Sequence, residues 1–66
     1  MNRENERYLH VVDLITGRTY VNPAHIVQIA HRTSEKCEIY LTSGLPIQAK
    51  GSADEIVAML EKITAP

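Results

Sequence analysis

The chain has 66 residues, of which 44% are hydrophobic and 23% charged, and 7 Lys and Arg against 8 Asp and Glu give a net charge of -1. This length accommodates one small domain, and the near-neutral charge supplies no overall field that would attract DNA, RNA or an anionic membrane. No stretch approaches the roughly 20 apolar residues of a membrane span, so no membrane insertion is expected. A single cysteine, Cys37, cannot form an internal disulfide, which favours a reducing, cytoplasmic location.

The chain begins with a polar segment and continues with a predicted β-hairpin. Residues 1–7 (MNRENER) lack apolar periodicity and predict a frayed lead-in, and residues 8–66 are expected to form a single domain. From Tyr8 to Leu14, β-branched and aromatic residues predict a strand. A turn at Thr16-Gly17 and a short returning strand over Arg18 to Val21 complete the hairpin.

The first predicted strand carries apolar side chains on both of its faces. Alternation places Leu9 and Val11 on one face and Val12 and Leu14 on the other. A strand of this kind is predicted to be covered on both sides. With only one helix in the chain, part of that apolar surface is expected to remain available to a partner.

A proline interrupts the pattern before the third strand. Pro23 lacks an N–H for a sheet ladder and predicts a corner or an edge at Asn22-Pro23. The strand pattern resumes over His25 to His31. Alternation there groups Val27 with Ile29 and places Ile26 on the opposite face.

Two further strands are predicted after a polar hairpin loop over Arg32 to Lys36. A turn at Ser43-Gly44 separates them, and Pro46 marks the second as an edge strand or lies near its start. Six apolar residues are predicted to point inward. These are Cys37, Ile39 and Leu41 from the first strand and Leu45, Ile47 and Ala49 from the second.

The last segment predicts a helix. Ser52 and Glu55 have the spacing of a capping box, in which each side chain accepts a hydrogen bond from the other residue's backbone N–H. The helix is expected over Ala53 to Thr64, with an apolar stripe at helical spacing formed by Ile56, Met59, Leu60 and Ile63. The expected fold class is α+β, a small antiparallel sheet of four or five strands followed by one C-terminal helix packed on it.

The order of these motifs resembles a known family. The resemblance extends from Leu9 to Ile63 and rests on Asn22-Pro23, Ile26 and Ile29, the stretch Ile39 to Gly44, and the stretch Lys50 to Ile56. In this order the chain resembles the FlbD-like (SwrD-type) family of small bacterial flagellar and swarming-motility proteins. It differs from the family in its polar lead-in, in Pro46 and in Gly51, where the family tends to carry an acidic residue. The resemblance implies a cytoplasmic accessory protein of flagellar assembly or motility, with no catalytic residues to transfer.

A second similarity concerns residues 22–60. Their order is also similar to the first half of a LytTR-type DNA-binding domain, which continues with a further strand-rich half. Here the sequence stops at Pro66, so this similarity supports only the alternative function given below.

Few residues of the sequence indicate a catalytic or metal-binding site. His25 and His31 are separated by roughly 20 Å of strand, and with one cysteine the chain has no spacing typical of a metal site. Cys37 alternates with Ile39 and Leu41, which favours a packing role over a nucleophilic one. No metal, cofactor or enzymatic activity is therefore expected.

A binding function remains. The predicted function is a non-enzymatic bacterial protein-protein interaction module, self-associating or bound to another protein, with an accessory role in motility implied by the resemblance. The side chains proposed for its contact face are Leu9, Val11, Ile26 and Tyr40. The alternative is a small LytTR-like nucleic-acid-binding regulator, a partner class disfavoured by the dispersed positive charge. Its proposed contacts are Arg18, Arg32, Lys36 and Lys50.

Overall fold

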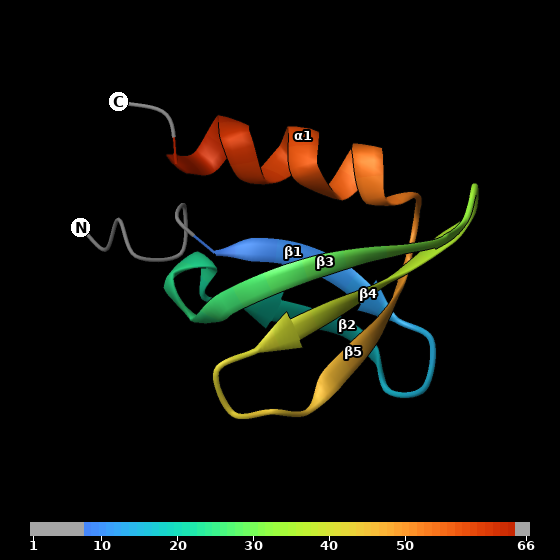
Figure 1. The fold of residues 1–66 in the computed structure, drawn as a ribbon, viewed down its shortest axis with the longest axis horizontal. Helices are drawn as coiled ribbons and strands as arrows, with labels where there is room; N and C mark the ends of the chain where they lie inside the picture. Colours follow the sequence, from blue (N-terminus) through green and yellow to red (C-terminus); the bar gives the residue numbers. More distant parts are fainter. Residues whose placement is uncertain (1–7, 65–66) are drawn as a thin grey trace.

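A computed structural model describes residues 8–64. It has five antiparallel strands followed by a single helix packed on them, which confirms the predicted α+β class (Figure 1). The spatial order of the strands is β2-β1-β5-β4-β3, so β2 and β3 are the two edges of the sheet. The predicted lead-in over residues 1–7 lies outside the described residues.

Strands β1 (Leu9–Asp13) and β2 (Gly17–Val21) form the predicted hairpin. The carboxylate of Asp13 closes the turn, because its Oδ1 accepts hydrogen bonds from the backbone N–H of Ile15 at 2.8 Å and of Thr16 at 3.2 Å. The bond from Ile15 lowers the pKa of Asp13, since it favours the ionised form. Gly17 completes the turn with a φ of 93°, a conformation that glycine adopts without a Cβ clash.

The other three strands are β3 (Ile26–Thr33), β4 (Lys36–Leu41) and β5 (Pro46–Lys50). They form an antiparallel meander, and β5 pairs with β4 on one side and with β1 on the other. A 3-10 turn, η2 (Pro23–His25), makes the corner predicted from the proline. Asn22 caps this turn by accepting a hydrogen bond from the N–H of Ala24 at 3.0 Å.

Strand β3 departs from simple alternation, and one predicted grouping is wrong. A β-bulge between Ile26 and Gln28 inserts Val27 as an extra residue. Ile26 and Ile29 therefore share one face and both pack against the core, while Val27 is 63% exposed. Simple alternation places Val27 and Ile29 on the same face, because it does not account for an inserted residue.

The two loops predicted on either side of β4 also differ from those in the structure. Strand β3 continues to Thr33 and β4 begins at Lys36, so the predicted five-residue loop shortens to the turn at Ser34-Glu35. Leu45, predicted to point inward, precedes β5 and is 73% exposed. Pro46 is the first residue of β5, where a missing N–H is tolerated.

Helix α1 (Ala53–Thr64) begins with the predicted capping box. Ser52 Oγ accepts from the N–H of Glu55 at 3.1 Å, and Glu55 Oε1 accepts from the N–H of Ser52 at 2.9 Å. Ile56 is the buried residue of the helix and Ile63 packs beside the core, whereas Met59 of the predicted stripe is 40% exposed. The helix covers one face of the sheet and contacts β3, β1 and β4 (Figure 1).

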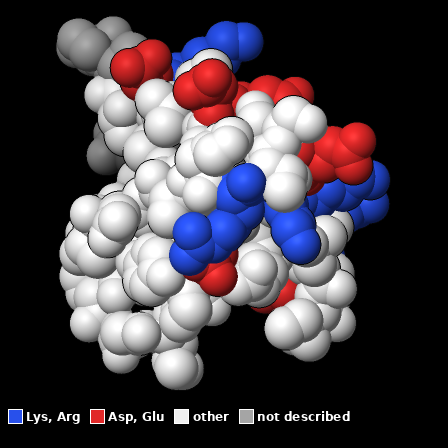
Figure 2. Space-filling model, turned by 45° about the vertical axis from the view of Figure 1, so that its right-hand side comes forward, with Lys and Arg blue, Asp and Glu red and all other residues white. Residues whose placement is uncertain are grey.

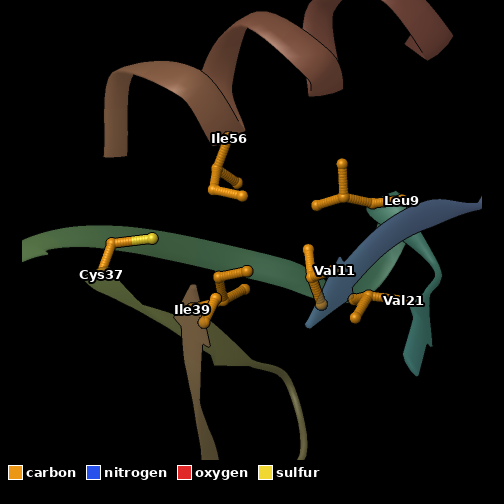
Figure 3. Packing of buried hydrophobic residues seen from close by; sticks show 7 residues of the cluster. Leu9, Val11, Val21, Cys37, Ile39 and Ile56 are labelled. Atoms are coloured by element: carbon orange, nitrogen blue, oxygen red, sulfur yellow. The ribbon is translucent and has the colours of Figure 1, made fainter. Parts of the chain in front are cut away.

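The core lies between α1 and this covered face (Figure 3). Its residues come from four strands and the helix, whereas β3 and η2 contribute no buried residue. They are Leu9, Val11, Val21, Cys37, Ile39, Ala49 and Ile56.

Candidate interaction face

The side of the sheet turned away from α1 is not covered by any described element, and we call it the open face. Strand register determines which residues share it, because cross-strand partners lie on the same face. Among the β1–β2 and β4–β5 partners, five pairs alternate with the core pairs and so belong to the open face. They are His10–Tyr20, Val12–Arg18, Glu38–Gln48, Lys36–Lys50 and Tyr40–Pro46.

Three of the four residues proposed for a protein contact lie elsewhere. Leu9 and Val11 are core residues with 1% and 3% exposure, because the odd-numbered face of β1 is the one that packs beneath α1. Ile26 is half-buried and packs against the same core, since the bulge in β3 turns it inward. Only Tyr40 lies on the open face, and the proposed contact face is corrected accordingly.

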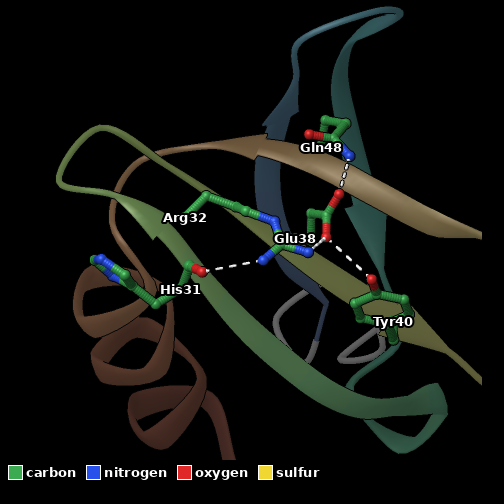
Figure 4. Close-up of polar contacts among 5 residues, drawn as sticks. All are labelled: His31, Arg32, Glu38, Tyr40 and Gln48. Atoms are coloured by element: carbon green, nitrogen blue, oxygen red, sulfur yellow. Dashed lines mark hydrogen bonds and ion pairs between the residues drawn. The ribbon is translucent and has the colours of Figure 1, made fainter.

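The centre of the open face holds a polar network around Glu38 on β4 (Figure 4). Its carboxylate forms an ion pair with Arg32 and accepts hydrogen bonds from the Gln48 side-chain amide and, at 3.0 Å, from the hydroxyl of Tyr40. The bonds from Gln48, Arg32 and Tyr40 lower the pKa of Glu38, and Glu38 in turn raises the pKa of Arg32. Sequence reasoning missed this network, although alternation already places Glu38 and Tyr40 on one face.

The Glu38 network predicts a pH-dependent stability. A carboxylate whose folded pKa is lowered contributes stability above its unfolded pKa and loses that contribution as the pH falls through the folded value. Glu38→Gln is therefore expected to lower the urea midpoint at pH 7, and the difference from the wild type should disappear as the pH falls well below the usual glutamate range. Measuring both midpoints from pH 7 to pH 2.5 checks this. An equal difference at all pH values would contradict it.

The open face also collects positive charge that the sequence disperses. The four residues named for nucleic acid in the alternative function lie on four of the five strands: Arg18 on β2, Lys50 on β5, Lys36 on β4 and Arg32 on β3, while β1, between β2 and β5, has no Lys or Arg. We call them the basic row. Lys36 and Lys50 are direct cross-strand partners, and the ion pair with Glu38 directs Arg32 to the same face.

Charge is therefore divided between the two sides of the molecule. The basic row, counted with Glu38 and with Glu35 in the β3–β4 turn, has a net charge of +2. Figure 2 shows Lys and Arg side chains across the middle of one view of the surface and Asp and Glu side chains mainly above them. The helix carries the opposite net charge of -2, from Asp54, Glu55, Glu61 and Lys62.

The β1–β2 end of the open face is aromatic and apolar. The rings of His10 and Tyr20 lie 4.4 Å apart between centroids and are tilted by 30°. Tyr20 is 57% exposed, and Val12 beside it is 42% exposed. Leu14, half-exposed, continues this apolar surface towards the hairpin turn.

A hollow of about 340 Å³ lies beside strand β2. Its apolar lining comes from Val21, Leu41 and Ile47, and its polar lining includes Thr19 and His25. His25 is held there by a 3.2 Å hydrogen bond between its Nδ1 and the Thr42 hydroxyl. A chain bound along the edge of β2 would lie next to this hollow.

The three histidines lie at separate positions in the fold, and one of them, His31, is the cross-strand partner of Cys37. Cys37 is fully buried, and burial raises the pKa of its thiol, which disfavours the thiolate. His10 stacks on Tyr20, His25 bonds Thr42, and His31 lies opposite Cys37 on β3. Within residues 8–64, no three His, Cys, Asp or Glu side chains are grouped as metal ligands would be.

No helix in the described part of the chain has the length and apolar character needed to cross a membrane. Comparison of the sequence with protein-family models and with curated proteins, and of the fold with solved structures, finds no match.

Proposed function

We propose that this chain is a non-enzymatic interaction module that self-associates, and that a second copy pairs along the edge of β2. The observation that carries the proposal is the difference between the two edges of the sheet. Strand β2 pairs with β1 in unbroken register over all five residues, and its other side has no strand partner among the described residues.

The opposite edge is poorly suited to such pairing. Strand β3 has two register shifts, one between Ile26 and Gln28 and one between His31 and Thr33. Bulges of this kind twist an edge and protect it from adding another strand. Strand β2, from Gly17 to Val21, has no bulge and no proline, so the backbone at this edge is regular and can pair with another strand; its one charged residue is Arg18.

Pairing of two copies along β2 brings complementary side chains together. An antiparallel arrangement with its two-fold axis at Thr19 places Arg18 of each copy opposite Tyr20 of the other. The arginine and tyrosine side chains then lie side by side on the same face of the joined sheet, and such cross-strand pairs add to the backbone hydrogen bonds of the new ladder. Such an isologous contact closes on itself and gives a dimer with a continuous sheet.

The small core gives a second reason for self-association. Only seven residues between 8 and 64 are fully buried hydrophobics, while eight large hydrophobic side chains there are exposed. Of these eight, Tyr20 lies on β2, and Val12, Leu14 and Ile15 lie on β1 or in the turn next to it. A second copy at this end of the sheet removes part of that surface from water, which favours association.

The sequence resemblance adds a cellular role to the proposal. Similarity to the FlbD-like family supports a bacterial, cytoplasmic accessory role in flagellar motility, exerted by the assembled form. The self-association and the role in motility are independent parts of the proposal, because the first rests on the edge of β2 and the second on the sequence motifs.

Light scattering on a sizing column, over a range of protein concentrations, tests the self-association. The wild type is expected to form a dimer, and Tyr20→Lys is expected to raise the dimer dissociation constant at least tenfold, because it removes the ring and places a like charge opposite Arg18 of the other copy. Val27→Lys is the matched control, since Val27 is exposed on the other edge strand. This variant should dimerise like the wild type.

The two variants separate the two edges of the sheet. Loss of the dimer in Val27→Lys with retention in Tyr20→Lys would place the contact on β3 and overturn the proposal. A monomeric wild type at all concentrations would overturn self-association altogether. Circular dichroism of each variant establishes that it is folded.

A further inference from the structure

We infer that the basic row binds single-stranded nucleic acid across the open face of the sheet. The row spans the whole width of the sheet, from Arg18 on one edge strand to Arg32 on the other. Neighbouring strands lie about 4.8 Å apart, so five strands extend over about 19 Å measured along the sheet. That width accommodates several nucleotides, as single-strand-binding β-sheets do.

The centre of the row is a pair of like charges that an anion would stabilise. Lys36 and Lys50 are direct cross-strand partners, an arrangement that disfavours the sheet when no counterion is present. The ion pair found among the described residues joins Arg32 to Glu38 and does not involve either lysine. A phosphate placed between the two ammonium groups would relieve their repulsion.

A surface hollow adjoins this pair of lysines. Its volume is about 450 Å³, and its lining residues include Lys36, Lys50, Thr33 and Leu14. The lysines give it a positive side and Leu14 an apolar one, which suits a nucleotide with its phosphate and its base. Glu35 also lines the hollow and limits its net charge.

Aromatic rings favour a single strand over a duplex. Tyr20 lies two residues from Arg18 on the same face of β2 and stacks with His10, and both residues are exposed. Exposed rings beside a basic groove stack on unpaired bases, which the paired bases of a duplex do not offer. An acidic protein segment would use the cations but would have no base to stack on these rings.

Fluorescence anisotropy with a labelled 12-nucleotide oligo-dT and a labelled 12-base-pair duplex tests this inference. We expect the full chain to bind the single strand more tightly than the duplex at 50 mM salt. Arg18, Lys36 and Lys50 form no ion pair with a described residue, so three phosphates are neutralised. The logarithm of the binding constant should then fall with the logarithm of salt concentration with a slope of about -2.

Lys36→Gln/Lys50→Gln is the test variant. It is expected to weaken binding at least tenfold at 50 mM salt and to reduce the slope to about -0.7, because one unpaired cation remains. Lys62→Gln is the matched control, since Lys62 is exposed on α1, away from the open face, and should bind like the wild type. Both lysines lie away from β2, so sizing of the double variant separates this inference from the proposed self-association.

Several outcomes would overturn the inference. One is the absence of binding to either probe at 50 mM salt, and another is equal weakening by Lys62→Gln, which would indicate nonspecific attraction. Tighter binding of the duplex would reject the single strand as the ligand. Tighter binding of a poly-glutamate peptide than of oligo-dT would show that the row recognises an acidic protein segment instead.

Discussion

Replacing Ile56 with alanine is expected to lower the free energy of unfolding by about 2–5 kcal/mol, the range for truncating a buried isoleucine. Ile56 is 1% exposed and is the buried residue of α1, so it joins the helix to the core. Alanine favours the helix slightly by propensity, and the loss therefore measures packing. Because a domain of this size rarely has more than about 3–5 kcal/mol of stability, the variant should be largely unfolded.

Far-ultraviolet circular dichroism without urea shows how much of the variant is folded, and a urea titration gives the free energy lost where an unfolding transition remains. Val57→Ala is the matched control, because Val57 is the next residue on the same helix and is 38% exposed. This variant should change stability by less than about 0.5 kcal/mol, as is usual for surface substitutions. Similar losses in both variants would show that the helix does not dock through Ile56.

Replacing Leu9 with alanine is expected to cost a similar amount, about 2–5 kcal/mol. Leu9 is 1% exposed beneath α1, and its truncation leaves a cavity in the core. If Leu9 belonged instead to a contact face, as its sequence pattern allows, the substitution would weaken association and leave the monomer stable. A core role for Leu9 means that the substitution changes the folding equilibrium, and a contact role means that it changes the association equilibrium.

A variant that does not dimerise distinguishes a core role of Leu9 from a contact role. In the Tyr20→Lys variant, Leu9→Ala should still lower the urea midpoint, because packing in the core does not depend on a second copy. Val12→Ala is the control on the other face of the same strand, where the side chain is 42% exposed and the expected change is small. A larger effect of Val12→Ala than of Leu9→Ala would reverse the two faces of β1.

Local signals were sufficient for most of the elements. The glycine turn before Arg18, the corner at Pro23 and the capping box at Ser52 each act within a few residues, and the structure has all three. Alternation likewise identified Cys37 and Ile39 as core residues. These features depend on backbone sterics and on short-range hydrogen bonds, which are determined by the identities of a few neighbouring residues.

The assignment of faces required the tertiary structure. Strand β1 is apolar on both sides, so only the position of α1 decides that Leu9 and Val11 are buried and Val12 is not. The bulge at Val27 reverses the alternation of β3 at a residue that no local signal marks. Of the four residues predicted for a contact face, only Tyr40 therefore lies on the open face.

The charge distribution likewise depends in part on the sequence and in part on the tertiary structure. Composition alone gave a nearly neutral chain with dispersed cations, and that statement is correct along the sequence. The strand order places β5 between β1 and β4, and the register sets Lys50 directly opposite Lys36. Pairing between distant segments thus assembles the basic row, whereas the negative charge of the helix is already present in its continuous sequence.

By itself, the sequence determined the strands, the turns and the capped helix, because these follow from side-chain periodicity and from the conformational preferences of glycine, proline and asparagine. Only the tertiary structure decided which face of the sheet is covered, which edge is free of bulges and which charges meet. Those properties depend on strand order and register, which are set by the packing of residues far apart in the chain.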